Sequence, residues 1–407
     1  MLIVLCLLST CFIQLSIGAP SGREDGSGIK LNEGEVLFEG DIILTKEQAA
    51  ALKESSRTKR QAVLNSVRWQ NDTINYFYDG LNNTQIQYME LAIEYIRSRT
   101  CIKFIRNRNA DKPLRIISGD GCWSGLGFLN NYRPRELSFG PGCLDVSTGV
   151  HELLHTLGVT HEQQRSDRDE YLYVDASNVS SEWRFTLEKE NTLNLSPFDY
   201  GSVMLYGFDE IGNGSMRPKD MDYKWTMGSD RVSFYDMNTI NVHYNCKRKC
   251  STQLKCENGG YTNPANCNVC NCPNGFEGPL CSQLPAKRTM REATTSWVTY
   301  STIFGDNFDS AGKLPYNSYV VVTAPAGRTI EIQIIKLEKV VCNADCYFHG
   351  VEIKFKDDPR TTSPIFCCDD ELDRTRIFKS KHNPTMILLY TRSGQPKVTY
   401  RIRHTNG

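Results

Sequence analysis

The chain has no excess of charge of either sign and no long apolar run beyond its first residues. Its 47 Lys and Arg residues balance 47 Asp and Glu residues, so the composition gives no sign of a nucleic-acid partner. After residue 18 no stretch is long and apolar enough to span a bilayer. Long repeats and low-complexity tracts are also absent. What is present is a 407-residue chain with 40% hydrophobic residues, enough for two or three globular domains.

The apolar start of the chain, residues 1–18, predicts a signal peptide. Small residues (Ser16, Gly18 and Ala19) surround the expected cleavage point. An uncleaved anchor is the alternative, because no Lys or Arg precedes the apolar run. A signal peptide implies a secreted, extracellular protein.

Cysteine is absent from residues 12–100 and then recurs in three separate groups. Loss of Cys6 and Cys11 with the signal peptide leaves an even number, which fits an oxidising compartment and three separately cross-linked units. Five N-glycosylation motifs agree with that compartment, although Pro197 weakens the motif at Asn194. The groups are Cys101, Cys122, Cys143 and Cys246; Cys250, Cys256, Cys267, Cys270, Cys272 and Cys281; and Cys342, Cys346, Cys367 and Cys368. The motifs begin at Asn71, Asn82, Asn178, Asn194 and Asn213.

Residues 19–60 are polar, lack cysteine and end in the basic run Arg-Thr-Lys-Arg. A run of this kind is usually a solvated charge cluster. Here it lies between a signal peptide and the first cysteine-bearing unit, so we interpret it as the end of a propeptide. We expect a furin-like convertase to cleave between Arg60 and Gln61.

Three units follow, with expected boundaries at 61–248, 249–282 and 286–405. In the first, apolar spacing predicts helices over 86–96 and 150–157, the second capped by Ser147 or Thr148, and strands over 76–78 and 114–117. The second is too short to fold without cross-links. The third alternates apolar and polar residues, which predicts an antiparallel sandwich with strands over 329–334, 351–355 and 398–402.

The residues that carry chemistry lie in one window, residues 151–162, which holds three of the chain's seven histidines. On a helix, His151 and His155 project from one face and can reach one Zn²⁺. Glu152 is placed to act as general base. Gly158 allows a turn that delivers His161 as third ligand, which leaves a coordination position open for substrate. Structural histidines on an amphipathic helix are the alternative.

A second element lies at residues 202–206, Ser-Val-Met-Leu-Tyr. A methionine turn beneath the zinc accompanies the long form of this motif. Met204 fits that turn, and Tyr206 is placed to bind the metal or to donate to an oxyanion. The alternatives are a methionine that fills the core and a packed tyrosine.

Together these segments resemble the astacin family of metalloendopeptidases over about residues 61–246. Residues 151–171, 202–206, 122–124 and 137–143 carry the resemblance. It implies a multidomain protein whose α+β metzincin domain has two lobes around a zinc cleft. It also implies one Zn²⁺ per chain on His151, His155 and His161, with Glu152 as base and Tyr206 as a switchable fifth ligand.

The propeptide adds to the resemblance. Residues 38–41, Phe-Glu-Gly-Asp, resemble the family's inhibitory motif, which implies that Asp41 occupies the zinc until cleavage; a surface turn is the alternative. The resemblance also implies that Glu162 meets the new N-terminus. Leu205 stands where the family usually has His, and this departure suggests altered packing or specificity. Arg217 or Lys219 is a candidate for binding an acidic substrate side chain, a family preference.

The cysteines extend the comparison. Residues 250–281 resemble an EGF-like module, without the preceding carboxylates that a calcium-binding version has. Residues 286–405 resemble a CUB domain, and we make no prediction of how its four cysteines pair. The order of the three units resembles nematode astacins. The implied disulfides are Cys101–Cys246, Cys122–Cys143, Cys250–Cys267, Cys256–Cys270 and Cys272–Cys281.

The sequence therefore predicts a secreted zinc endopeptidase, activated by propeptide removal, that hydrolyses extracellular proteins such as cuticle or matrix proteins. The alternative is an inactive extracellular binding protein that acts through its EGF-like and CUB-like modules. Neither hypothesis includes a nucleic-acid partner or a membrane span.

Overall fold

The structure is a computed structural model. It describes residues 35–38, 40–45, 68–128, 135–177, 179, 184–190, 192–208, 210–212, 214–305, 312–380 and 382–406. The expected signal peptide and the expected cleavage site at Arg60 and Gln61 lie outside the described residues. No helix within the described part of the chain has the length and apolar character that a bilayer span requires.

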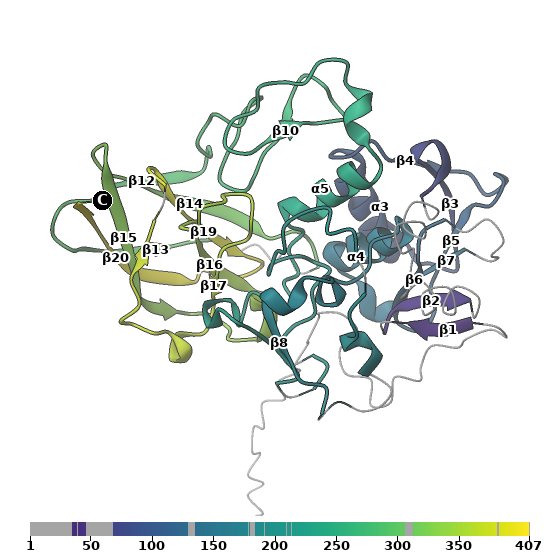
Figure 1. Cartoon of the computed structure of the whole chain (residues 1–407), viewed down its shortest axis with the longest axis horizontal. Helices are drawn as coiled ribbons and strands as arrows, with labels where there is room; N and C mark the ends of the chain where they lie inside the picture. The colour runs from purple at the N-terminus through teal and green to yellow at the C-terminus, as the bar shows by residue number, and fades with distance from the viewer. Residues whose placement is uncertain are drawn as a thin grey trace, which may run out of the picture.

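The N-terminal part of the fold is a seven-stranded mixed sheet with helices packed on it (Figure 1). The four strands at one side of the sheet run parallel, and the two N-terminal strands extend the other side beyond β6, which is antiparallel to its neighbour among the four. In spatial order the strands are β1 (Glu35–Phe38), β2 (Ile42–Thr45), β6 (Cys122–Gly125), β7 (Glu136–Phe139), β5 (Leu114–Ile117), β3 (Thr73–Asp79) and β4 (Lys103–Arg106). Residues 35–45 therefore form an added edge of the sheet next to β6.

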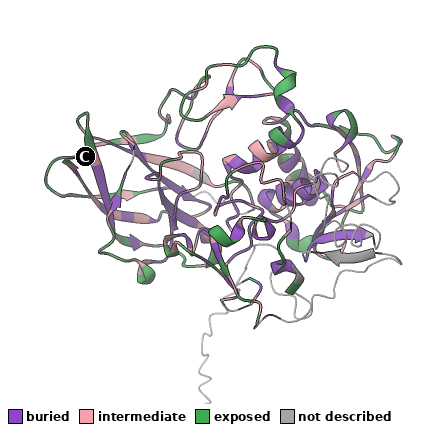
Figure 2. Cartoon of the chain, viewed as in Figure 1, coloured by how far each residue is buried: buried purple, intermediate pink, exposed green. Residues whose placement is uncertain are grey.

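Helix α3 (Asn83–Arg97) is longer than the predicted 86–96 because Asn82 and Gln85 form a capping box one turn earlier. Its buried face includes Met89, Ala92 and Ile96, which share one core with the sheet and with helix α4 (Val146–Thr156). Figure 2 shows the central helix α4 almost entirely buried, whereas α3 also has an exposed face.

Helix α4 begins earlier than predicted, and the predicted cap was wrong. Asp145 caps the helix by accepting a hydrogen bond from the Ser147 amide at 2.7 Å, so Ser147 lies inside the first turn. The helix ends at Thr156, and Gly158 follows with φ +94°. This left-handed conformation strongly favours glycine and turns the chain back toward the helix.

A second, smaller core follows along the chain. It surrounds an antiparallel pair of strands, β8 (Leu172–Val174) and β9 (Met216–Pro218). Helix α5 (Phe234–His243) then packs with the first core, and the disulfide Cys101–Cys246 ties its end to the segment after α3.

Residues 250–281 have little regular structure, only the short strands β10 (Tyr261–Thr262) and β11 (Cys270–Asn271). Side chains of this segment donate to backbone carbonyls after α3: Asn263 to Ser98 at 2.9 Å and Asn271 to Arg99 at 2.8 Å. The segment contains three disulfides, Cys250–Cys267, Cys256–Cys270 and Cys272–Cys281.

The C-terminal unit is a two-sheet sandwich around its own apolar core. The pairing is antiparallel as predicted except between β12 and β14, which run parallel. Between these two strands the chain crosses to the other sheet and forms β13 there. Its disulfides are Cys342–Cys368 and Cys346–Cys367. One sheet contains β12 (Arg288–Glu292), β14 (Tyr316–Thr323), β19 (Thr385–Thr391), β16 (His349–Ile353) and β17 (Ile365–Phe366); the other contains β13 (Val298–Ile303), β20 (Lys397–Asn406), β15 (Arg328–Glu338) and β18 (Phe378–Lys379).

Candidate metal centre

Three histidines and one aspartate bring their side-chain ligand atoms together at the C-terminal half of α4. His151 Nε2 lies 3.0 Å from His155 Nε2 and 3.3 Å from His161 Nε2. Asp41 Oδ2 lies 3.2 Å from both His151 Nε2 and His161 Nε2. Zinc bonds of about 2.0–2.1 Å directed to the corners of a tetrahedron would separate their ligand atoms by about 3.3–3.4 Å. The four atoms are therefore spaced as the ligands of one tetrahedral zinc ion.

Backbone carbonyls orient two of the imidazoles. The Val203 oxygen lies 2.7 Å from His151 Nδ1, and the Val159 oxygen lies 2.7 Å from His155 Nδ1. Each Nδ1 therefore carries the ring proton, and each Nε2 presents its lone pair to the centre. Burial lowers the pKa of His155 to about 4, which keeps this imidazole neutral as a metal ligand must be.

Asp41 is fully buried among the imidazoles. Burial alone would raise the pKa of this carboxyl group, but the nearby His161 and His155 hold it well below its usual range. Its Oδ1 atom makes no hydrogen bond to the described residues and lies 3.4 Å from His155 Nε2. A buried carboxylate among three imidazole nitrogens is a donor set that zinc binds well, so the residues present fit the metal.

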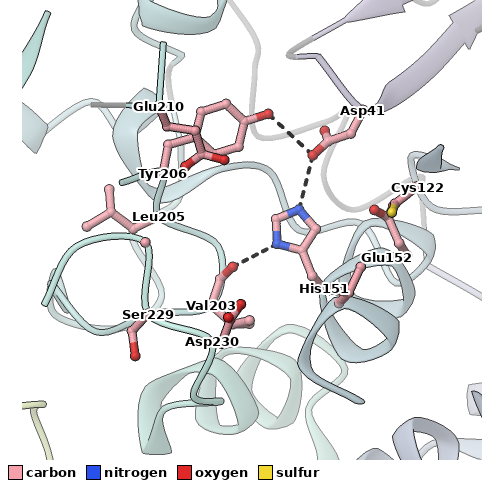
Figure 3. Close-up of a pocket in the computed structure, with 12 residues that line it drawn as sticks. Asp41, Cys122, His151, Glu152, Val203, Leu205, Tyr206, Glu210, Ser229 and Asp230 are labelled. Carbon is pink, nitrogen blue, oxygen red and sulfur yellow. Dashed lines mark hydrogen bonds and ion pairs between the residues drawn. The ribbon is translucent and has the colours of Figure 1, made fainter. Parts of the chain in front are cut away.

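Glu152 and Tyr206 lie beside these ligands in one pocket (Figure 3). Burial, with the charge of Asp41, raises the pKa of Glu152 well above its usual value, and Glu152 Oε2 makes no hydrogen bond to the described residues. The Tyr206 hydroxyl donates to Asp41 Oδ2 at 3.3 Å. Both side chains thus line the pocket together with Asp41 and His151.

The methionine turn is held from α5. Asp236 accepts hydrogen bonds from the Ser202 hydroxyl at 2.6 Å and from the Val203 amide at 3.1 Å. Met204 is buried in the core that contains α4, and its carbonyl oxygen accepts from the Glu162 amide at 2.8 Å. The turn therefore positions the Val203 carbonyl that orients His151.

Other predicted residues lie away from the ligands. The Glu162 side chain is 15% exposed and pairs with Arg165 at 3.0 Å, and loss of hydration raises the pKa of this carboxyl group to about 8. Leu205 is buried and lines the pocket. Arg217 and Lys219 stack over the exposed ring of Tyr173 and are not among the residues lining the pocket.

The structure also describes most of the predicted glycosylation and disulfide residues. Asn71 and Asn82 are exposed, and Asn194 is half-buried, with its amide donating to Ser166 Oγ at 3.1 Å. Asn178 and Asn213 lie outside the described residues. The five disulfides implied by the resemblance are all present, including Cys122–Cys143 at the edge of the pocket.

Sequence reasoning missed several residues that hold the ligands in place. The carbonyls of Val203 and Val159 carry no side-chain signal. Asp236 follows Ser233 by three residues and forms a capping box with it, which is a pattern visible in the sequence. Arg392 contacts the cap of α4 from the sandwich, and no local pattern marks it.

Comparison with known proteins gives the following relationships. Residues 61–245 match the family model described as Astacin, a peptidase family. Two relatives from Caenorhabditis elegans are zinc metalloproteinase nas-17, 38% identical over 98% of this chain and 94% of its own length, and zinc metalloproteinase nas-24, 40% identical over 86% and 89%. The solved structure of high choriolytic enzyme 1, a hatching enzyme zinc-protease from medaka fish (Oryzias latipes), is 32% identical with a TM-score of 0.41, covering 44% of this chain and 92% of that one.

Proposed function

Since the chain belongs to the astacin family and is a zinc metalloproteinase, we propose that it is a secreted endopeptidase made as an inactive precursor. The observation that carries the proposal is the Asp41 carboxylate lying between His151 and His161 at 3.2 Å from each Nε2. In that position the propeptide fills the side of the centre that a substrate carbonyl needs. Cleavage after Arg60 by a furin-like convertase would release the segment that carries Asp41.

In the proposed active enzyme, His151, His155 and His161 hold one zinc ion. When bound, zinc supplies Lewis acidity that polarises a peptide carbonyl and makes water more acidic. Glu152 is placed to take the proton from the attacking water and to pass it to the leaving amine. Burial of its carboxyl group keeps bulk water from competing for that proton.

Tyr206 stabilises the developing negative charge in this proposal. Its hydroxyl already donates to an anionic oxygen, Asp41 Oδ2, at 3.3 Å. Once Asp41 has left, the same hydroxyl is placed to donate to the oxyanion of the substrate. The aspartate of the propeptide thus stands in for the charged oxygen of the reaction.

In this proposal, residues 249–282 form an EGF-like domain and residues 286–405 form a CUB-like domain. Their supporting features are the three disulfides of the first, two interleaved and one following, and the two-sheet sandwich of the second. We propose extracellular proteins as substrates, with cuticle and matrix proteins as the class that the nematode resemblance favours.

The test uses the full chain after cleavage by a furin-type convertase. We expect cleavage of a denatured generic protein, loss of cleavage with a zinc chelator and recovery when zinc is returned. Glu152→Gln is the matched control, because it removes the base while the three imidazoles remain. An inactive binding protein would give no zinc-dependent cleavage, and Glu152→Gln would not differ from the natural chain.

A further inference from the structure

A loop of the C-terminal sandwich, residues 354–364, contacts the chain just before the methionine turn. It connects β16 and β17, which lie on the side of the sandwich nearest the helices (Figure 1). Thr362 donates two hydrogen bonds to Asp199, from its amide to Oδ1 at 3.1 Å and from its hydroxyl to Oδ2 at 3.4 Å. The Gly201 amide also donates to Oδ1, at 3.1 Å. The sandwich and the segment before the turn therefore hold the Asp199 carboxylate together.

Gly201 shows how closely the sandwich approaches this segment. A Cβ atom built on Gly201 would lie 2.5 Å from both Cβ and Oγ1 of Thr362, closer than atoms that are not bonded approach each other. Gly201 is not among the glycines with a positive φ. The contact with Thr362, rather than an unusual backbone conformation, is therefore the reason why a side chain does not fit at this position.

Asp199 depends on these donors because it is only 2% exposed. Burial raises the pKa of its carboxyl group, while the hydrogen bonds from Gly201 and Thr362 and the charge of the nearby Lys354 act in the opposite direction. Within the described residues, the Thr362 hydroxyl is the donor to Oδ2. A buried polar atom that loses its donor cannot turn to water instead. Removal of this hydroxyl should therefore displace the Asp199 side chain.

A displacement of Asp199 would reach the metal centre by two routes. The Asp199 amide donates to Glu162 Oε1 at 3.1 Å, and Glu162 follows the ligand His161 in the chain. The Asp199 carbonyl accepts from the Ser202 amide at 3.0 Å. Ser202 begins the turn whose Val203 carbonyl lies 2.7 Å from Nδ1 of the ligand His151. Groups that orient metal ligands in this way usually affect metal affinity.

The loop that carries Thr362 is itself fixed within the sandwich. Lys354 donates to the Thr361 carbonyl at 2.9 Å, and the Ser363 amide donates to Glu352 Oε1 at 2.9 Å. Lys354 and Glu352 are both buried and pair with each other at 2.6 Å. A buried and well-connected polar network is rigid, so the sandwich offers Asp199 a fixed support.

We propose that Thr362 of the C-terminal sandwich is a positioning residue for the zinc centre, which holds Asp199 and thereby fixes the turn that orients His151. The inference rests on the proposed peptidase function. It extends that function by making the C-terminal unit a support for catalysis in addition to any role in binding other proteins.

The experiment is a double-mutant cycle on the activated full chain, with Thr362→Val and Asp199→Ala alone and combined. Zinc Kd is measured by competition with a chromophoric chelator, and kcat and KM are measured with one peptide. Thr362→Val should raise the zinc Kd about threefold to tenfold, the equivalent of one hydrogen bond. It should lower kcat with little change in KM, because Thr362 does not line the pocket. In Asp199→Ala, the same substitution should have no further effect.

Two variants serve as controls. Thr362→Ser keeps the hydroxyl and should stay close to the natural chain. Thr375→Val removes an exposed sandwich hydroxyl that donates to Asp373 at 2.6 Å, and it should leave the zinc Kd and kcat unchanged. A thermal melt identifies the folded variants. If Asp199→Ala does not fold, the comparison of Thr362→Val with Thr362→Ser decides the test.

An unchanged zinc Kd in folded Thr362→Val, or the same loss with and without Asp199, would overturn the positioning role. A natural chain that binds zinc but cleaves no peptide would instead overturn the proposed function, and the zinc Kd of the variants would still decide whether Thr362 positions the centre.

Discussion

At the scale of single residues, the metal centre depends on contacts that keep its ligands in one orientation. His151 and His155 each face a backbone carbonyl through Nδ1 at 2.7 Å. The Tyr206 hydroxyl in turn donates a hydrogen bond to Asp41 Oδ2 at 3.3 Å. A short polar network of this kind is sensitive to the loss of a single oxygen atom.

Replacement of Asp41 tests the inhibitory role of the propeptide. In a chain whose cleavage is blocked by Arg60→Ala, we expect Asp41→Asn to raise peptidase activity, because a neutral amide is a weaker zinc ligand than a carboxylate. Activity on a short peptide is the measurement. Asp373→Asn, at an exposed acid of the sandwich, is the matched control; equal activity of the two variants would contradict a blocking role for Asp41.

Replacement of Tyr206 tests the oxyanion role. Tyr206→Phe in the activated enzyme should lower kcat by about 10²–10³-fold, the usual loss when one oxyanion donor is removed. KM should change little, because the hydroxyl acts on charge that develops during the reaction. A variant with a raised KM and a normal kcat would show that the hydroxyl binds substrate instead.

At the scale of elements, helix α4 and the turn after it decide where the third ligand lies. The spacing of His151, Glu152 and His155 could be interpreted from the sequence because a helix places such residues locally. The start of the helix could not, because Asp145 and Ser147 are both good caps and only packing decides between them. The position of Gly158 was visible as a turn signal, and the structure gives it φ +94°.

Gly158→Ala tests that turn. A side chain in the left-handed region costs roughly 1–2 kcal/mol, so we expect this loss in the free energy of unfolding, measured by denaturant titration. Zinc affinity should also fall, since the turn carries the Val159 carbonyl that faces His155. Gly327→Ala is the control, because Gly327 also has a positive φ and a Cβ atom there would meet no other atom within 4 Å. This variant should cost similar stability without affecting zinc.

At the scale of the whole molecule, the C-terminal sandwich is attached to the helix that carries the ligands. The Arg392 side chain, 1% exposed, donates to Asp145 Oδ2 at 3.1 Å and to the Tyr347 carbonyl at 3.1 Å. Tyr347 also donates to Asp145 Oδ2, at 3.2 Å. The cap of α4 therefore depends on residues about 200–250 positions away along the chain, as the contact separations of 202 and 247 show.

Loss of Arg392 should destabilise both units together. Removing one partner of a buried ion pair costs about 3–5 kcal/mol because the other charge stays buried. We expect Arg392→Met to lower the midpoint of a thermal melt strongly. Arg374→Met, which breaks the more exposed pair with Asp369, should change it little. If the two variants lowered the melting midpoint equally, the contact between Arg392 and the cap of α4 would not stabilise the two units together.

The same contacts show what sequence alone can and cannot predict. Local spacing predicted the helix of His151 and His155, and the residues after it suggested Tyr206. The resemblance to the astacin family, which the comparisons confirm, added Asp41 and the role of Tyr206 as a switchable ligand. The capping box of Ser233 and Asp236 is a local signal, but it does not reveal the contact of Asp236 with the Ser202 turn, and no local pattern reveals the contact of Arg392 with Asp145.

The most direct measurement is the zinc content of the purified mature protein, determined by elemental analysis alongside His155→Ala and Glu152→Gln. The account predicts one zinc ion per chain in the natural protein and in Glu152→Gln, and a large loss of zinc in His155→Ala. A natural chain without zinc, or a zinc content that His155→Ala leaves unchanged, would contradict a metal held by His151, His155 and His161.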